Sequence, residues 1–123
     1  MELPIIEVKQ ILDGVEWLKN RNYLTYLPEN IKRNTTDTVS LVTEAENRPT
    51  DWGGDTFHGM SQAVEIEIFY GENFNQNTND CEIELMQLLE YKGWRITNSR
   101  PHIVDPDTNQ IIKVFFVGKN KLI

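Results

Sequence analysis

The sequence has a single cysteine, Cys81, and only two histidines among its 123 residues. One cysteine excludes an intrachain disulfide, and it excludes a zinc site built from several thiolates of one chain. No segment approaches the ~18 consecutive apolar residues that a transmembrane helix needs. The opening Met-Glu-Leu-Pro lacks the basic and then apolar pattern of a signal peptide. We therefore expect that the protein does not associate with a membrane and that it stays, at least at first, in the reducing cytoplasm where it is made.

Basic residues are also scarce. The chain carries 12 Lys plus Arg against 19 Asp plus Glu, which gives a formal net charge of -7. Such a surface repels the phosphate backbone, which argues against tight binding to nucleic acid. It is compatible with a position beside DNA that slides past without sticking. The length suits one domain, residues 1–123, with a modest core that needs neither disulfide nor metal.

The residue types that perform catalysis do not form a recognisable pattern. His58 and His102 lie on different expected elements, with no metal ligand at suitable spacing around them. Gly53-Gly54 is not followed by the Lys-Ser/Thr pair of a phosphate-binding loop. Cys81 falls near the start of an expected helix, whose dipole could lower its pKa, but we favour a small core residue. We predict no catalytic, metal-binding or cofactor-binding residues and no enzymatic activity.

Hydrophobic periodicity predicts two helices, at residues 4–13 and 80–91, each followed by a glycine that can end it. For the second helix, Asn79 is the expected N-cap and Glu82 the partner in a capping box. Strands are expected at residues 23–27, 38–44, 64–70, 94–98 with a continuation near Ile103, and 111–118. This order predicts an α+β domain: a mostly antiparallel sheet of four to five strands with two helices packed on one face.

The clearest expected strand covers residues 64–70, where apolar and polar side chains alternate. Its even-numbered residues are apolar and point to one side, which we expect to be buried. Glu65 and Glu67 point to the other side. The default interpretation of these two carboxylates is a solvated face, and the functional alternative is an acidic lining.

A long polar segment, residues 45–61, separates two of the expected strands, and we predict that it is a flexible loop. It contains Asp51, Trp52, Gly53, Gly54, Asp55 and Phe57. A loop of this length in a small domain is usually functional or disordered. Because a polar loop seldom exposes two large aromatic side chains, Trp52 and Phe57 either fold back as a lid or anchor a partner. We expect this loop to be a candidate subunit or partner interface.

Several short motifs follow one another in a fixed order along the chain. They are Val42-Thr43-Glu44, the segment with Asp51-Trp52-Gly53-Gly54-Asp55 and Phe57, the strand at residues 63–70, His102-Ile103-Val104-Asp105-Pro106-Asp107-Thr108, and the terminal Lys119-Asn120-Lys121. By the order and spacing of these motifs, the chain resembles a family of small tail-component proteins in siphophages and prophages of low-GC Gram-positive bacteria. The resemblance extends from Leu3 onward.

The resemblance implies a tail terminator, similar in role to the terminator of phage lambda. Such a protein is a small α+β subunit of a ring, usually a hexamer, at the head-proximal end of the tail tube. The ring is made in the host cytoplasm, stops tube polymerisation, contacts the tail tube protein and presents a surface to the head-completion proteins of the neck. DNA passes through the ring without specific binding, so Glu65 and Glu67 could line its lumen. No catalytic residues come with this family.

Three classes of function remain open from the sequence. The leading hypothesis is a structural virion protein, either a terminator or another neck protein such as a head-completion or tail-completion protein. A small bacterial adaptor module is the alternative from another class, and an enzyme is the least favoured. Self-assembly separates the first two classes, because a terminator forms closed rings whereas an adaptor stays monomeric or dimeric.

Overall fold

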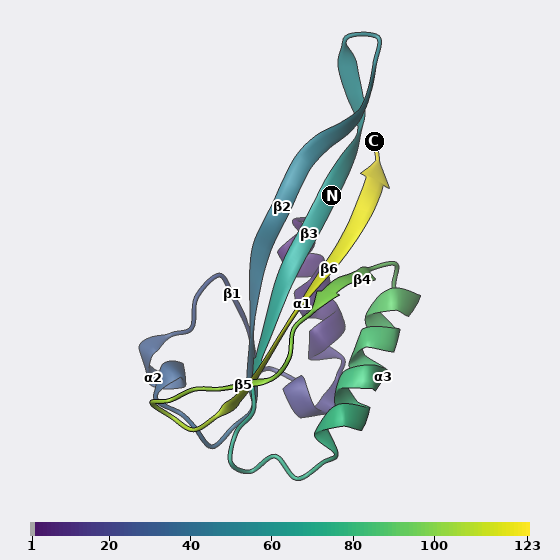
Figure 1. The fold of residues 1–123 in the computed structure, drawn as a ribbon. Helices are drawn as coiled ribbons and strands as arrows, with labels where there is room; N and C mark the ends of the chain where they lie inside the picture. The colour runs from purple at the N-terminus through teal and green to yellow at the C-terminus, as the bar shows by residue number, and fades with distance from the viewer. Residues whose placement is uncertain (1) are drawn as a thin grey trace.

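The computed structural model describes residues 2–123 and shows one sheet with helices beside it (Figure 1). The helical elements are α1 (Pro4–Asp13), η1 (Glu16–Leu18, a 3-10 turn), α2 (Glu29–Lys32) and α3 (Thr78–Tyr91). The strands are β1 (Asn22–Leu24), β2 (Val39–Gly53), β3 (Thr56–Phe69), β4 (Arg95–Ser99), β5 (Ile103–Val104) and β6 (Ile111–Leu122). The predicted α+β class is confirmed, with a sheet of six strands where four to five were expected.

The sheet is antiparallel except at one edge. Its strand order is β1-β2-β3-β6-β4, and β5 pairs with the opposite end of β6 from β4. Only β1 runs parallel to its neighbour, with Asn22 opposite Ser40 of β2. β3 is the central strand and pairs along most of its length with both β2 and β6. Three long strands therefore make up most of the sheet.

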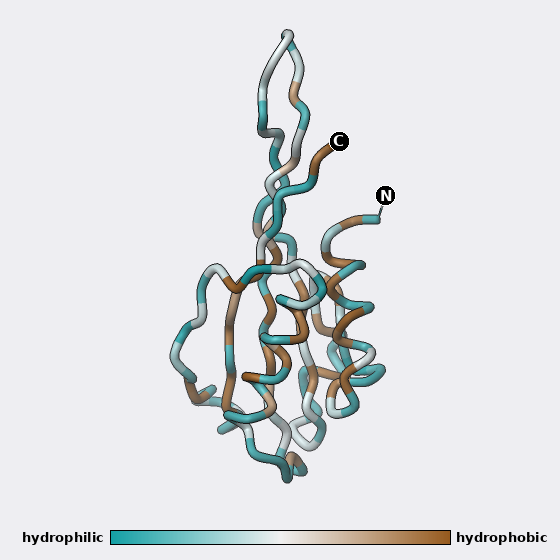
Figure 2. The backbone as a smooth tube through the Cα atoms, turned by 90° about the vertical axis from the view of Figure 1, so that its right-hand side faces the viewer, coloured by the Kyte–Doolittle hydropathy of each residue, from teal (hydrophilic) through white to brown (hydrophobic). Residues whose placement is uncertain are grey.

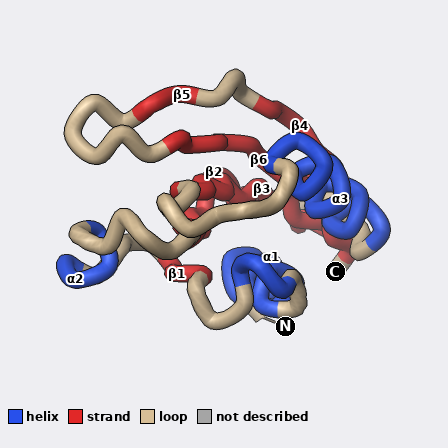
Figure 3. The backbone as a smooth tube through the Cα atoms, turned by 90° about the horizontal axis from the view of Figure 1, so that it is seen from below, coloured by secondary structure: helices blue, strands red, loops and turns tan. Residues whose placement is uncertain are grey.

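The core lies between the sheet and the two longer helices, α1 and α3, which cover the same face (Figures 1 and 3). β3 directs Val64, Ile66 and Ile68 to this face, where Phe115 of β6 and Trp94 join them. All five side chains are at most 1% exposed. Burial of apolar surface contributes roughly 25 cal/mol per Å², so this layer supplies most of the stability of the fold. The predicted placement of two helices on one face is confirmed.

The helices are short, and none within residues 2–123 has the length and apolar character needed to cross a lipid bilayer. α1 begins and ends where the sequence predicts. α3 begins two residues earlier than predicted, because Asn77 is the N-cap and its side chain accepts the Asp80 N–H. The predicted cap at Asn79 and its capping box with Glu82 are therefore wrong.

The predicted loop at residues 45–61 is wrong, because the whole segment belongs to a β-hairpin. β2 continues to Gly53, and β3 begins at Thr56. The two central residues of the turn, Gly54 and Asp55, have φ values of 59° and 68°. Positive φ at both positions is what a two-residue type I′ turn requires, and Gly-Asp suits it. Gly54 is thus a central residue of the turn, and Gly53 pairs with Thr56 at its base.

The upper part of this hairpin, residues 46–60, projects beyond the rest of the molecule, and we call it the arm (Figures 1 and 2). A bulge between Glu44 and Glu46 marks its base. The colouring of Figure 2 shows a largely hydrophilic chain along the arm. Within residues 2–123, no residue of the arm belongs to the core beneath the helices, so the arm lacks the one-sided apolar alternation that reveals a strand in a sequence.

Two adjacent phenylalanines on β6 allow a test of this layered packing. Phe115 is buried against the helices, whereas Phe116 lies on the opposite face, half-buried. Phe115→Ala is expected to lower the free energy of unfolding by about 3–5 kcal/mol, because it opens a cavity in the core. Phe116→Ala is the matched control and is expected to cost clearly less. Urea unfolding of the two variants measures both values, and equal losses would contradict the layer assignment.

Candidate functional site

The arm contributes no residue to the hydrophobic core described for residues 2–123. From Val42 toward the hairpin turn, the outer edge of β2 has no neighbouring strand within the described residues, because β1 pairs with β2 only as far as Val42. On the other side, β6 accompanies β3 only up to the pair of Gly59 and Leu122. The last part of the arm is therefore a ribbon of two strands. Such a ribbon is marginally stable in water by itself, so a contact with another molecule would order it further.

The tip of the arm brings together the residues that the sequence singled out. Trp52 and Phe57 face each other across the hairpin, edge to face, with ring centroids 5.7 Å apart. Trp52 is 69% exposed. Asp51 and Asp55 flank the pair, and within residues 2–123 neither forms an ion pair. The aromatic pair does not fold back on the core, so the lid alternative is wrong and an exposed contact surface remains.

The edges of the arm are poor templates for pairing with another strand. Pro49 offers no N–H to a neighbour, which is a common way to blunt an edge. Close to it, the Arg48 guanidinium pairs with the Glu46 carboxylate at 2.5 Å. On the other strand, the ring nitrogen Nε2 of His58 lies 3.0 Å from the Gly53 carbonyl oxygen and supports the turn. The tip, with its exposed aromatic and acidic side chains, is therefore the better contact surface.

Glu65 and Glu67 lie on the sheet face opposite the helices, the side that the sequence predicts. Glu67 stands between Leu41 of β2 and Val114 of β6, and it is half-buried among these apolar neighbours. Burial raises the pKa of Glu67, and the nearby Glu65 carboxylate raises it further, whereas Arg100 lowers it. The two carboxylates thus form a small acidic patch on a partly apolar face, in addition to the acidic arm tip.

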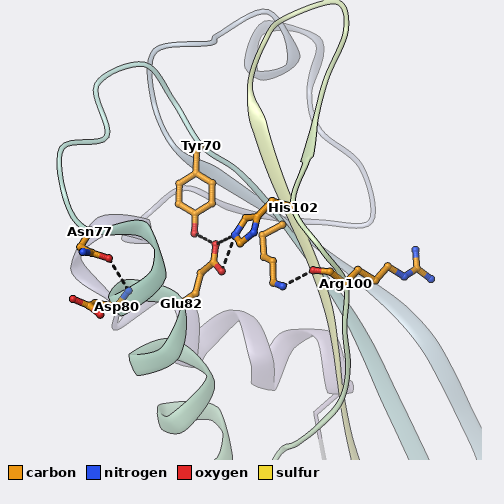
Figure 4. Close-up of polar contacts among 7 residues, drawn as sticks. Tyr70, Asn77, Asp80, Glu82, Arg100 and His102 are labelled. Carbon is orange, nitrogen blue, oxygen red and sulfur yellow. Dashed lines mark hydrogen bonds and ion pairs between the residues drawn. The ribbon is translucent and has the colours of Figure 1, made fainter.

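A polar cluster of buried Tyr70 and Glu82 with the more exposed His102, absent from the sequence predictions, joins α3 to the end of β3 (Figure 4). Tyr70 Oη donates a hydrogen bond to Glu82 Oε2 at 2.6 Å, and His102 Nε2 lies 2.8 and 2.9 Å from the two oxygens. Burial, together with Glu82, raises the pKa of the Tyr70 hydroxyl. Both oxygens of Glu82 are occupied, so the cluster acts as a structural clamp. The spacing of these three residues in the sequence does not predict that they are in contact.

Cys81 is buried beside this cluster, and its thiol donates to Gln76 Oε1 at 3.4 Å. Burial and the neighbouring carboxylates of Glu84 and Asp80 raise the pKa of the thiol. The idea that the helix dipole lowers this pKa is therefore wrong, whereas the placement as a small core residue is confirmed. Within the described part of the chain, no group of three or more His, Cys, Asp or Glu is arranged to hold a metal ion.

Comparison with protein families covers almost the whole chain. A family model described as "Protein of unknown function (DUF806)" matches residues 2–122. The chain belongs to the DUF806 family. The match includes the arm, the sheet and both longer helices of this DUF806 protein. A search of curated proteins gave no significant match.

The acidic patch of this DUF806 protein allows a prediction of how the stability of the fold depends on pH. A raised pKa at Glu67 means that the folded state binds this proton more tightly than the unfolded state, so the ionised carboxylate costs stability at neutral pH. Glu67→Gln is expected to raise the free energy of unfolding by roughly 0.5 kcal/mol at neutral pH. The gain should shrink as the pH falls and disappear below the ordinary value of 4.5, because the wild-type carboxyl is then protonated in both the folded and the unfolded state.

Thermal unfolding across this pH range measures the difference between the variant and the wild type. Glu44→Gln removes an exposed carboxylate from the neighbouring strand and serves as the control, with little change expected. A gain for Glu67→Gln that is constant with pH would show that the effect does not come from ionisation.

Proposed function

We propose that this chain is a structural virion protein: a tail terminator that forms a ring at the head-proximal end of the tail tube of a siphophage or prophage. The ring stops tube polymerisation and joins the tail to the neck proteins of the head. The observation that carries this proposal is the arm, which extends an exposed aromatic and acidic tip away from a small, fully formed core. A protein whose most prominent feature lies outside its own core is suited to contact other subunits.

The polar residues of the chain support an assembly role. Glu82, His102 and Tyr70 are the residue types that serve as acids and bases in enzymes, but here they hydrogen bond to one another. Their arrangement fixes α3 against the sheet. Two surface features, the arm tip and the acidic patch of Glu65 and Glu67, are suited to contacts with macromolecules.

The acidic patch fits a position beside moving DNA. Glu65 and Glu67 lie on the face opposite the two longer helices, α1 and α3, and the chain as a whole carries a net charge of -7. Carboxylates facing a channel repel phosphates, so DNA would pass without being held. In the proposed ring, this face of the sheet lines the lumen and the helices lie outside.

The proposal is tested by the mass of the protein in solution and by its effect on tail tubes. Light scattering over a range of concentrations is expected to show closed rings of about six subunits, because heterologous contacts close into rings. Added to polymerising tail tube protein of the same phage, the chain should shorten the tubes and appear as a cap at one end in negative-stain images.

The outcomes separate the proposed function from its alternatives. Capped, shortened tubes support a terminator, even if the ring forms only on the tube. Rings that bind head-completion proteins and leave tube length unchanged would assign the chain to another part of the neck. A monomer or dimer that neither binds nor caps tubes would contradict the proposal and favour a small adaptor module.

A further inference from the structure

A groove on the helix side of the molecule lies between α1 and α3. It has a volume of about 530 Å³, and Ile11 and Leu88 contribute apolar surface to it. Trp94 lies beneath, buried, with Lys119 Nζ 4.8 Å from the centroid of its ring. Glu7 of α1 and Lys92, just after α3, line its sides. The two helices therefore leave a partly apolar depression on the face that would lie outside the proposed ring.

The rim of this groove is basic, which is unusual for a chain with a net charge of -7. Lys92 and Lys119 line the groove, and Arg95 lines a shallower hollow that adjoins it through Lys119. Lys119 and Lys121 approach Glu7 at 3.6 and 3.3 Å. Within residues 2–123, Lys92 and Arg95 form no ion pair. The Glu7 carboxylate therefore offsets part of the charge of Lys119 and Lys121, and the rim as a whole retains a net positive charge.

The arm tip has the complementary composition. It carries the exposed indole of Trp52 together with Asp51 and Asp55, whose carboxylates lack a cationic partner within the described residues. The arm extends away from the helices in both side views (Figures 1 and 2), so the tip does not lie over the groove of its own chain. A groove that receives this tip must belong to a second copy.

A second hollow, of about 470 Å³, lies on the opposite face between α2, the sheet and the turn after β5, and it provides a comparison. It is the more apolar of the two, with Leu41 and Phe69 among its lining residues. Its charged lining residues, Lys32 and Asp105, have opposite signs. An aromatic side chain alone would fit either hollow, but the acidic tip favours the groove with the basic rim, because unlike charges attract and a balanced site gives no such gain.

We infer that the arm tip of one copy docks in the α1–α3 groove of the next, with Trp52 on the apolar floor and Asp51 and Asp55 against Lys92 and Arg95. This inference rests on the proposed ring and identifies its subunit contact. The contact is heterologous, since arm and groove are different surfaces, and repetition of such a contact closes a ring. Because charges at its rim are exposed to solvent, the contact weakens as salt is raised.

Substitutions at the tip test the docking. Trp52→Ala is expected to weaken self-association at least ~30-fold, as the loss of a central aromatic anchor does. Tyr26→Ala is the matched control: Tyr26 is also 69% exposed, but it lines the second hollow. Its removal should leave self-association unchanged. The reverse pattern, with Tyr26→Ala disruptive and Trp52→Ala silent, would overturn the inference.

A double-mutant cycle tests the charge pairing. Asp51→Asn with Asp55→Asn neutralises the tip, and asparagine tolerates the positive φ of 58° and 68° at these positions. Lys92→Gln with Arg95→Gln neutralises the rim. Each pair should weaken association by about tenfold at low salt, and the four changes together by little more than either pair. Effects that simply multiply would show that the two sets of charges do not meet.

Mixing two defective chains tests the docking by complementation. Trp52→Ala keeps an intact groove, and a chain with Lys92→Glu and Arg95→Glu keeps an intact arm. An equimolar mixture should form heterodimers and nothing larger, because one arm–groove contact is restored and neither free end can extend it. Circular dichroism of each variant confirms that it is folded. A mixture that stays monomeric, or that forms full rings, would overturn the docking.

The failure of this inference differs from the failure of the proposed function. Rings that form equally well with Trp52→Ala would overturn arm docking and leave the ring standing. Arm-dependent self-association by a chain that never caps tail tubes would support the docking and contradict the terminator function. A wild-type chain that stays monomeric at every concentration and on tail tubes would overturn both.

Discussion

The structure depends on one constraint: only the lower half of the central hairpin has helices to pack against. Where α1 and α3 cover the sheet, β3 must alternate apolar and polar residues, and Val64, Ile66 and Ile68 fill the core. Beyond the bulge at Glu44 and Glu46, the same two strands continue without that cover. Burial in the core therefore fixes the register of the two strands at the base of the hairpin. Beyond the base, the backbone hydrogen bonds between the strands and the tight turn maintain this register as far as the tip.

This division separates stability from contact. The hydrogen-bonded cluster of Tyr70, Glu82 and His102 fixes α3 to the sheet, and the apolar layer beneath the helices provides the folding energy. The arm contributes little to the attachment of α3 or to the folding energy, so its residues are available to contact another molecule. Its aromatic pair, the two aspartates that lack a cationic partner within residues 2–123 and the basic groove on the helix side are then explained together as parts of one repeated contact.

The sequence predicts the fold class, both long helices, the buried face of β3 and the exposed side of Glu65 and Glu67, because one-sided burial imposes a periodic pattern. It does not predict the arm as a hairpin, since strands without a buried face have no such pattern. The Gly54-Asp55 turn between Trp52 and Phe57 was the available signal, as two-residue hairpins favour this composition. The contact of His102 with Glu82 depends on tertiary packing and has no local signature.

The central claim is that the arm tip of one copy reaches the groove of another, and site-specific cross-linking tests it most directly. A photoreactive phenylalanine analogue in place of Trp52 keeps an aromatic ring at the tip and can be activated after assembly. We expect cross-links between chains, from position 52 to peptides that contain Leu88, Lys92 or Lys119. Cross-links confined to one chain, or directed to the hollow around Tyr26, would contradict it.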